Sequence, residues 1–161
     1  MKRGIVIALT LSTVQILGCA TRPPHETTAS PTAPAPAPGV ILARALVDAA
    51  LSMQGQPYRF GGAAPGGFDC SGLVAYAAKR VAILVPRTAH EQLKAGVAIP
   101  TAQVTPGDLV FMHFKKELHV GILTAPGQFV HAPSSGGRVR IDRLDAAPYA
   151  QGYFAARRIT P

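Results

Sequence analysis

The feature that most constrains the fold is a change in residue pattern at Pro106-Gly107. Before it, apolar residues recur at helical spacing in the segments 41–49 and 70–81. After it come short runs rich in β-branched and aromatic residues, separated by Gly- and Pro-containing turns. These runs are 108–114, 118–124, 128–132, 139–141 and 153–159. Helices followed by strands predict an α+β fold, with N-terminal helices packed on a five- to six-stranded antiparallel sheet.

Local signals place the ends of the helices. The first is expected to stop before Gly55 and Pro57, because both residues break helices. A third, short helix is expected to begin after Thr88, since Thr88 and Glu91 form a capping-box pattern, and to end at Gly96. The segment 57–67 between the first two helices is expected to be a loop.

The first 38 residues differ from the rest of the chain. A basic start precedes the apolar run 5–17, which is shorter than a membrane span and has the length of a secretory signal. The segment 20–38 is rich in Pro, Ala, Thr and Ser, a composition that forms extended chain rather than a core. We therefore predict a signal peptide at 1–18, a tether at 19–38 and a folded domain at 39–161.

The apolar run ends in Ile-Leu-Gly-Cys at 16–19, which resembles the bacterial lipobox. The resemblance implies that cleavage occurs before Cys19 and that Cys19 carries a lipid, an anchor stable enough to hold the protein on a membrane. The alternative is an ordinary signal peptide with a chance cysteine. Because Ala20 stands where aspartate would signal retention in the inner membrane, we expect an outer-membrane location facing the periplasm.

The second cysteine, Cys70, lies where a glycine-rich loop turns into a helix. Asp69 is a typical N-cap residue, which leaves Cys70 in the first helical turn. Unpaired N–H groups and the helix dipole at this position favour a thiolate. A lone thiol in an exported domain is a candidate nucleophile, and a buried structural thiol is the alternative.

Two histidines, His119 and His131, lie in separate strand-like, apolar segments. One activated cysteine followed by separate histidines is the pattern of a cysteine peptidase or acyltransferase. The residues alone leave open which histidine contacts the sulfur. They also leave open a catalytic zinc site made of Cys70, His119 and His131.

The net charge limits the partners. The chain carries a formal charge of +8, but its Lys and Arg residues are scattered and no aromatic platform accompanies them. We therefore expect no nucleic acid partner. A cationic surface suits an anionic cell wall or membrane instead.

Several segments together resemble the NlpC-type family of bacterial cell-wall cysteine peptidases. They occur in the family's order over most of the domain: Pro-Tyr-Arg-Phe-Gly-Gly at 57–62, Phe-Asp-Cys-Ser-Gly-Leu-Val at 68–74, Pro-Arg-Thr-Ala at 86–89, Pro-Gly-Asp-Leu-Val-Phe at 106–111, His-Val-Gly-Ile at 119–122 and Phe-Val-His-Ala-Pro at 129–133. The resemblance implies a papain-like fold and cleavage of peptidoglycan stem peptides, typically between γ-D-glutamate and a diamino acid.

The same resemblance implies roles for individual residues. Cys70 is expected as nucleophile, His119 as general base and His131 as the orienting third residue. Tyr58 is expected beside the thiol, where it assists the oxyanion or the substrate. Asp69 and Ser71 are expected to line the pocket for the free amine of the stem's first alanine.

The resemblance implies a monomer that needs no cofactor and no metal. Its partners are the stem peptides of peptidoglycan and, through the lipid on Cys19, a membrane. Two alternatives remain open: an inactive wall-binding scaffold, and an amidase or acyltransferase on the same fold.

Overall fold

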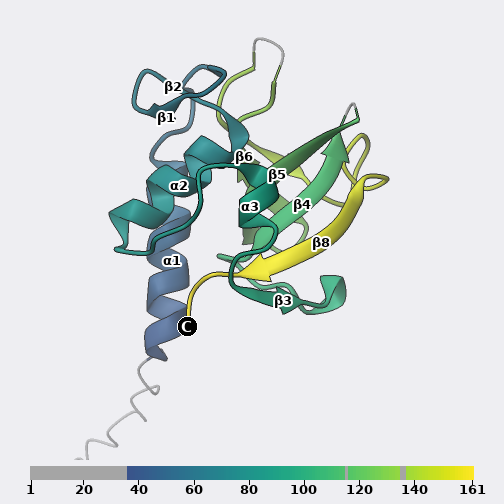
Figure 1. Cartoon of the computed structure of the whole chain (residues 1–161). Coiled ribbons are helices and arrows are strands. Elements are labelled where there is room, and N and C mark those ends of the chain that lie inside the picture. Colours follow the sequence, from purple (N-terminus) through teal and green to yellow (C-terminus); the bar gives the residue numbers. More distant parts are fainter. Residues whose placement is uncertain (1–35, 115, 135–136) are drawn as a thin grey trace, which may run out of the picture. The chain divides into compact units, whose positions relative to one another are not determined.

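The computed structural model describes residues 36–161 except 115 and 135–136, so the predictions for the signal peptide, Cys19 and most of the tether lie outside the described residues. Within this part, helices pack against a six-stranded antiparallel sheet, and a two-stranded hairpin forms a second, separate sheet (Figure 1). This arrangement confirms the α+β, papain-like fold class. No helix in these residues is long and apolar enough to cross a membrane.

The helices begin and end close to where the sequence places them. Helix α1 spans Pro38–Leu51 and has proline in its first turn, where the missing N–H costs nothing. Helix α2 spans Cys70–Arg80 and is capped by Asp69, as predicted. Helix α3 is confined to Ala89–Gln92, shorter than expected, although its predicted capping box is present.

Two elements were missed by the sequence reading. The segment expected as a loop contains a tight hairpin, β1 (Ala63–Ala64) with β2 (Gly67–Phe68), whose two-residue strands are too short to give a periodic pattern. Strand β3 (Val97–Ile99) is equally short. A single 3₁₀ turn at Thr101–Gln103 follows it.

The six-stranded sheet has the order β3-β8-β4-β5-β6-β7. Its longer strands are β4 (Leu109–Phe114), β5 (Glu117–Ala125), β6 (Gln128–His131), β7 (Arg140–Arg143) and β8 (Tyr153–Arg158). Strands β4 to β7 pair in sequence order, but β8 returns to lie between β3 and β4. The sheet is therefore antiparallel, as expected, but its strands do not all pair in sequence order.

Both faces of the sheet are covered. Alternate residues of β4 enter two different cores: Leu109 and Phe111 pack with the helices, and Val110 and Met112 pack on the opposite face. Leu46 of α1 and Leu73 of α2 belong to the helix-side core. The opposite core includes Leu123, Phe129, Leu144 and Tyr149, so the segment after β7 covers that face.

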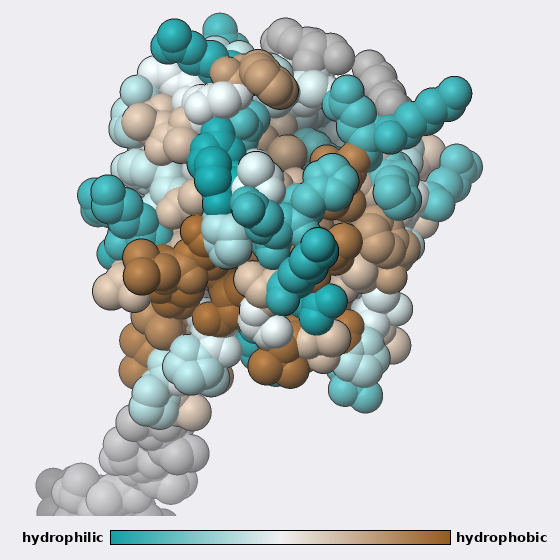
Figure 2. Space-filling view, viewed as in Figure 1, coloured by the Kyte–Doolittle hydropathy of each residue, from teal (hydrophilic) through white to brown (hydrophobic). Residues whose placement is uncertain are grey.

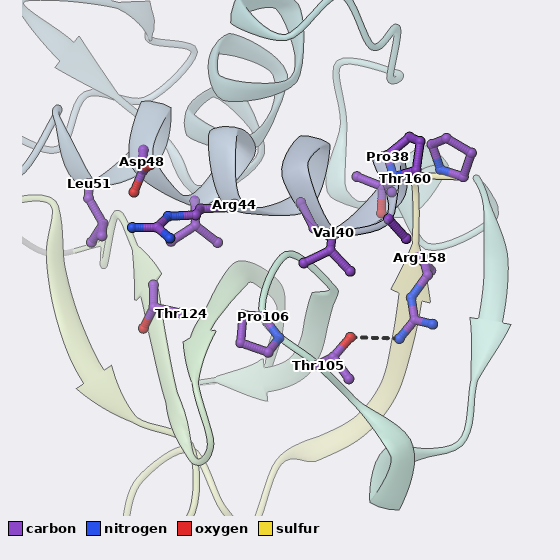
Figure 3. Close-up of a pocket in the computed structure, with 15 residues that line it drawn as sticks. Pro38, Val40, Arg44, Asp48, Leu51, Thr105, Pro106, Thr124, Arg158 and Thr160 are labelled. Carbon is purple, nitrogen blue, oxygen red and sulfur yellow. Dashed lines mark hydrogen bonds between the residues drawn. The ribbon is translucent and has the colours of Figure 1, made fainter. Parts of the chain in front are cut away.

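A large apolar groove lies along α1, away from Cys70. Its volume is about 1010 Å³, and its lining includes Val40, Val47 and Leu51 of the helix together with Pro106 and Pro161 (Figure 3). Figure 2 shows apolar side chains gathered near the start of the same helix, where Val40 and Ile41 are exposed. The groove contains none of the predicted site residues.

Candidate active site

Cys70 is the first residue of α2, and the chain holds this helix start tightly in place. Asp69 accepts a hydrogen bond of 2.6 Å from the Gly72 N–H. A Cβ on Gly72 would collide with the carbonyl oxygen of Gly62, so the loop can approach the helix only at glycine. The buried Gln92 amide donates to the carbonyl oxygens of Ser71 and Pro86. The helix start is thus fixed from three sides.

The Cys70 sulfur is partly buried and lies against strand β5. Burial raises the pKa of the Cys70 thiol, and hydrogen bonds from the backbone N–H groups of Val120, Ser71 and Cys70 lower it only in part. The net shift is upward. The prediction that the helix start alone favours a thiolate is therefore wrong, because desolvation outweighs the N–H groups. The thiol needs a base.

The two predicted histidines form a direct pair, and the first of them is the strand neighbour of the residue whose N–H faces this sulfur. His119 immediately precedes Val120, whose N–H points at Cys70. The Nε2 atom of His119 lies 2.7 Å from the Nδ1 atom of His131, and the side chains of both histidines are buried. Burial lowers the pKa of His119 to about 3 and the pKa of His131 to about 4. Both imidazoles are neutral near pH 7, which is the form that accepts a proton.

Gly121 explains the glycine of the His-Val-Gly-Ile segment. A Cβ at this position would lie 2.5 Å from the Phe129 ring and 3.2 Å from the His131 Cβ. The Phe129 ring packs against His131 with a centroid distance of 4.5 Å. Glycine therefore leaves the space that the second histidine and its aromatic support occupy.

Behind His131 lies a polar cluster that the sequence reading missed. The Asp142 carboxylate accepts hydrogen bonds from His131 Nε2 at 3.0 Å, from the Tyr149 hydroxyl at 2.9 Å and from Arg140 Nε at 2.9 Å. The sequence places Arg140 and Asp142 on one face of a strand, since alternate residues of a strand share a face. Predicting which residue of β6 they contact also requires the register of β6 on β7. In that register Arg140 pairs with His131 and Asp142 pairs with Phe129.

On the open side of Cys70, Asp69 is held by Arg87. The guanidinium donates to both carboxylate oxygens, at 3.0 and 2.7 Å, and the Gly61 N–H and the Ser71 hydroxyl also donate to this carboxylate. Burial acts to raise the pKa of Asp69, but the hydrogen bonds from Arg87 and Gly72 lower it overall. Arg87 lies in the Pro-Arg-Thr-Ala segment at 86–89, but the sequence did not predict its contact with Asp69.

Tyr58 is partly buried in the loop before α2. Burial raises the pKa of its hydroxyl, and the nearby Cys70 and Asp69 raise it further. Tyr58 is therefore close enough to interact electrostatically with both residues. The structure brings all six domain residues of the predicted site together, and their individual roles stay predictions.

The arrangement suits acid–base chemistry on a nucleophilic thiol. A neutral imidazole pair begins one residue before Val120 on β5, and the backbone N–H groups of Val120, Ser71 and Cys70 face the thiol. Within the described residues, no group of three His, Cys, Asp or Glu side chains is placed to hold a metal ion.

The comparisons place this site among known proteins. The profile of the NlpC/P60 family matches residues 55–158. "Murein DD-endopeptidase MepH" of Escherichia coli is 40% identical over 112 residues, covering 65% of this chain and 41% of that protein. "Probable endopeptidase NlpC" of the same organism is 36% identical over 124 residues, covering 74% of this chain and 80% of that protein.

A solved structure agrees. The peptidoglycan hydrolase RipB of Mycobacterium tuberculosis superimposes with a TM-score of 0.67 at 31% identity, over 76% of this chain and 67% of that one. Some of the curated relatives are much longer, and the chain spans 26% of one and 41% of another. The match covers the whole site from Tyr58 to Asp142, and this chain belongs to the NlpC/P60 family.

Proposed function

We propose that this protein is a cysteine endopeptidase that cleaves peptidoglycan stem peptides. The observation that carries the proposal is the buried His119–His131 pair, which starts one residue before the Val120 N–H that faces the Cys70 thiol at a helix start. The names of relatives support it, since one is called a murein DD-endopeptidase and another a peptidoglycan hydrolase. The chemistry that such a site supports is acyl transfer through a thioester.

The proposed reaction begins with the neutral site. His119 takes the proton of the Cys70 thiol as the sulfur attacks the substrate's carbonyl carbon, and the oxyanion forms near the Cys70 N–H. The His119 imidazolium then protonates the leaving amine, and the C–N bond breaks to give a thioester. A water molecule that loses its proton to His119 hydrolyses the thioester and restores the thiol. His131 orients His119 throughout.

We further propose that the cleaved bond joins γ-D-glutamate to the diamino acid. Asp69 and Ser71 would receive the free amine of the stem's first alanine, and Tyr58 would assist the oxyanion or the substrate. The lowered pKa of Asp69 supports this role, because the carboxylate stays ionised at the open side of the site. Arg87 would keep that carboxylate in place.

The proposal extends to the location of the protein. Cleavage before Cys19 would produce a lipoprotein, with the segment 19–38 as tether and the domain acting as a monomer on the periplasmic face of the outer membrane. The lipobox-like ending at 16–19 supports it. Replacing Cys19 by Ala should release the protein from the membrane fraction without changing the activity of the purified domain. A variant that stayed membrane-bound would refute lipid anchoring at Cys19.

The experiment that tests the enzymatic proposal is digestion of purified peptidoglycan, with the products identified by mass spectrometry. Cleavage between γ-D-glutamate and the diamino acid is expected. Cleavage of the bond between muramic acid and alanine would indicate an amidase, and binding without cleavage would indicate a scaffold. Cys70→Ala should lose all activity, and iodoacetamide should inactivate the wild type. A chelator should have no effect, whereas inhibition by it would favour zinc chemistry.

A further inference from the structure

The polar cluster behind His131 has a geometry that extends the site by one residue. Asp142 lies on β7, directly behind the second histidine, with its side chain 23% exposed and that of His131 fully buried. Its carboxylate accepts from Arg140, Tyr149 and His131 together. The carboxylate contacts His131, and His131 contacts His119, so Asp142 acts on the proposed base through the imidazole between them.

The hydrogen-bond chain determines where the histidine protons lie. An ionised carboxylate only accepts hydrogen bonds, so His131 Nε2, 3.0 Å away, carries a hydrogen. A neutral imidazole has one N–H, which leaves Nδ1 of His131 as an acceptor. His119 Nε2, 2.7 Å from that atom, must then be the donor. The remaining nitrogen of His119, Nδ1, is left with the lone pair that can take a proton.

We propose that Asp142 is a positioning residue that sets the tautomer of His131 and, through it, the tautomer of His119. The inference rests on the proposed cysteine peptidase reaction, in which His119 is the base. Arg140 and Tyr149 hold the carboxylate in place. When His119 gains its proton and becomes positively charged, the same chain aligns its Nε2–H toward His131 and the negative charge of Asp142 beyond.

The tautomers are tested by removing the acceptor from position 142. His131 Nε2, the Tyr149 hydroxyl and the Arg140 guanidinium all contact the same carboxylate oxygen, Oδ2. Asp142→Asn can keep an amide oxygen at that position, so it should leave the ring tautomers unchanged. Asp142→Leu is similar in size but has no acceptor, and it leaves Tyr149 and Arg140 as donors. His131 Nε2 then faces donors, so its hydrogen should move to Nδ1, His119 Nε2 should become an acceptor, and the hydrogen of His119 should move to Nδ1, where a lone pair is needed.

Two measurements test the proposal. In kinetics on a stem peptide, Asp142→Leu should lower kcat by about 10- to 100-fold with KM nearly unchanged, less than the 10²–10⁴-fold typical of a direct acid–base group. In nitrogen-15 NMR of the resting protein at neutral pH, the wild type should show His119 and His131 both protonated at Nε2. The variant should show the hydrogen moved to Nδ1 in both rings.

Asp145→Leu is the matched control. Asp145 pairs with Arg143 at the same two-residue spacing, but both side chains are exposed and, among the described residues, neither contacts a histidine. This variant should keep wild-type kinetics and tautomers. A structural role for Asp142 is separated by repeating Asp142→Leu in a His131→Gln background, where a residue that acts through His131 should cause little further loss.

Two outcomes would overturn the proposal. One is unchanged ring tautomers in Asp142→Leu. The other is an equal loss of kcat with and without His131, which would mean that Asp142 acts on stability alone. The NMR result does not depend on catalysis, so a wild type that failed to cleave stem peptides would refute the proposed function and leave the tautomer assignment to be judged by itself.

Discussion

Two arginine–aspartate pairs flank the site, and the same chemistry has different effects in each. Arg87 binds Asp69 on the open side, and Arg140 binds Asp142 behind the histidines. The other donors to Asp69 are mostly backbone N–H groups, so this carboxylate shapes a loop and a helix start. The other donors to Asp142 are side chains, a histidine and a tyrosine. The third partner of the carboxylate therefore determines whether the ion pair supports the local structure or the chemistry of the site.

The largest effect on activity is expected from removing the histidines between the two pairs. His119→Ala should lower kcat/KM by about 10²–10⁴-fold, because the base and the acid are both lost. His131→Asn and His131→Gln should retain more activity than His131→Ala, since an amide can still accept from His119. A double histidine variant should be little worse than His119→Ala, because the residues act as a unit.

The measurement is kcat/KM for these variants on one stem-peptide substrate. An inactive His131→Ala together with an active His119→Ala would reverse the two roles. Activities near wild type for both would show that neither histidine takes part in the reaction.

The two buried histidines should also affect how the stability of the protein depends on pH. The folded-state pKa values of about 3 for His119 and about 4 for His131 lie below the usual value of 6.5, so the unfolded chain binds protons first as the pH falls. The stability that the neutral pair contributes is fully present above about pH 6.5 and is lost as the pH falls toward 4. Each histidine should contribute a slope of up to ~1.4 kcal/mol per pH unit in that window.

Urea unfolding between pH 7.5 and 4.5 measures this slope. His90→Gln serves as control, because His90 is exposed and should leave the slope unchanged. A free energy of unfolding that stays flat over this range would contradict the burial of two neutral histidines.

The two pairs also differ in how far the sequence could predict them. Asp69 was placed correctly as an N-cap because its partner, the Gly72 N–H, lies three residues away. The helices α1 and α2 and the five longer strands from β4 to β8 follow from equally local patterns. Asp142 and its contact with His131 depend on strand register, which no local pattern specifies. The upward pKa shift of Cys70 was missed for a related reason, since burial arises only when α2 packs on β5.

Because Asp69 on the open side has a structural role, its removal should lower the stability of the protein. Asp69→Ala removes the cap of α2 and should lower the free energy of unfolding by about 0.5–2 kcal/mol. Asp69→Asn should restore most of it, because an amide oxygen also caps a helix. Urea unfolding at pH 7.5 measures both. Equal stability of Asp69→Ala and the wild type would mean that the Gly72 hydrogen bond does not hold the helix start.

The smallest expected effect belongs to a third pair, Arg143 with Asp145, which has the spacing of Arg140 and Asp142 but no third partner among the described residues. Both side chains are more than half exposed, at 63% and 55%, so water screens the attraction between them. Exposed pairs of this kind typically contribute about 0.2–1 kcal/mol. Arg143→Gln and Asp145→Asn should therefore lower the free energy of unfolding by less than 1 kcal/mol and leave kcat/KM unchanged. If either variant lost activity as Asp142→Leu is expected to, the spacing of the ion pair rather than contact with His131 would determine the effect, and the distinction between the pairs would fail.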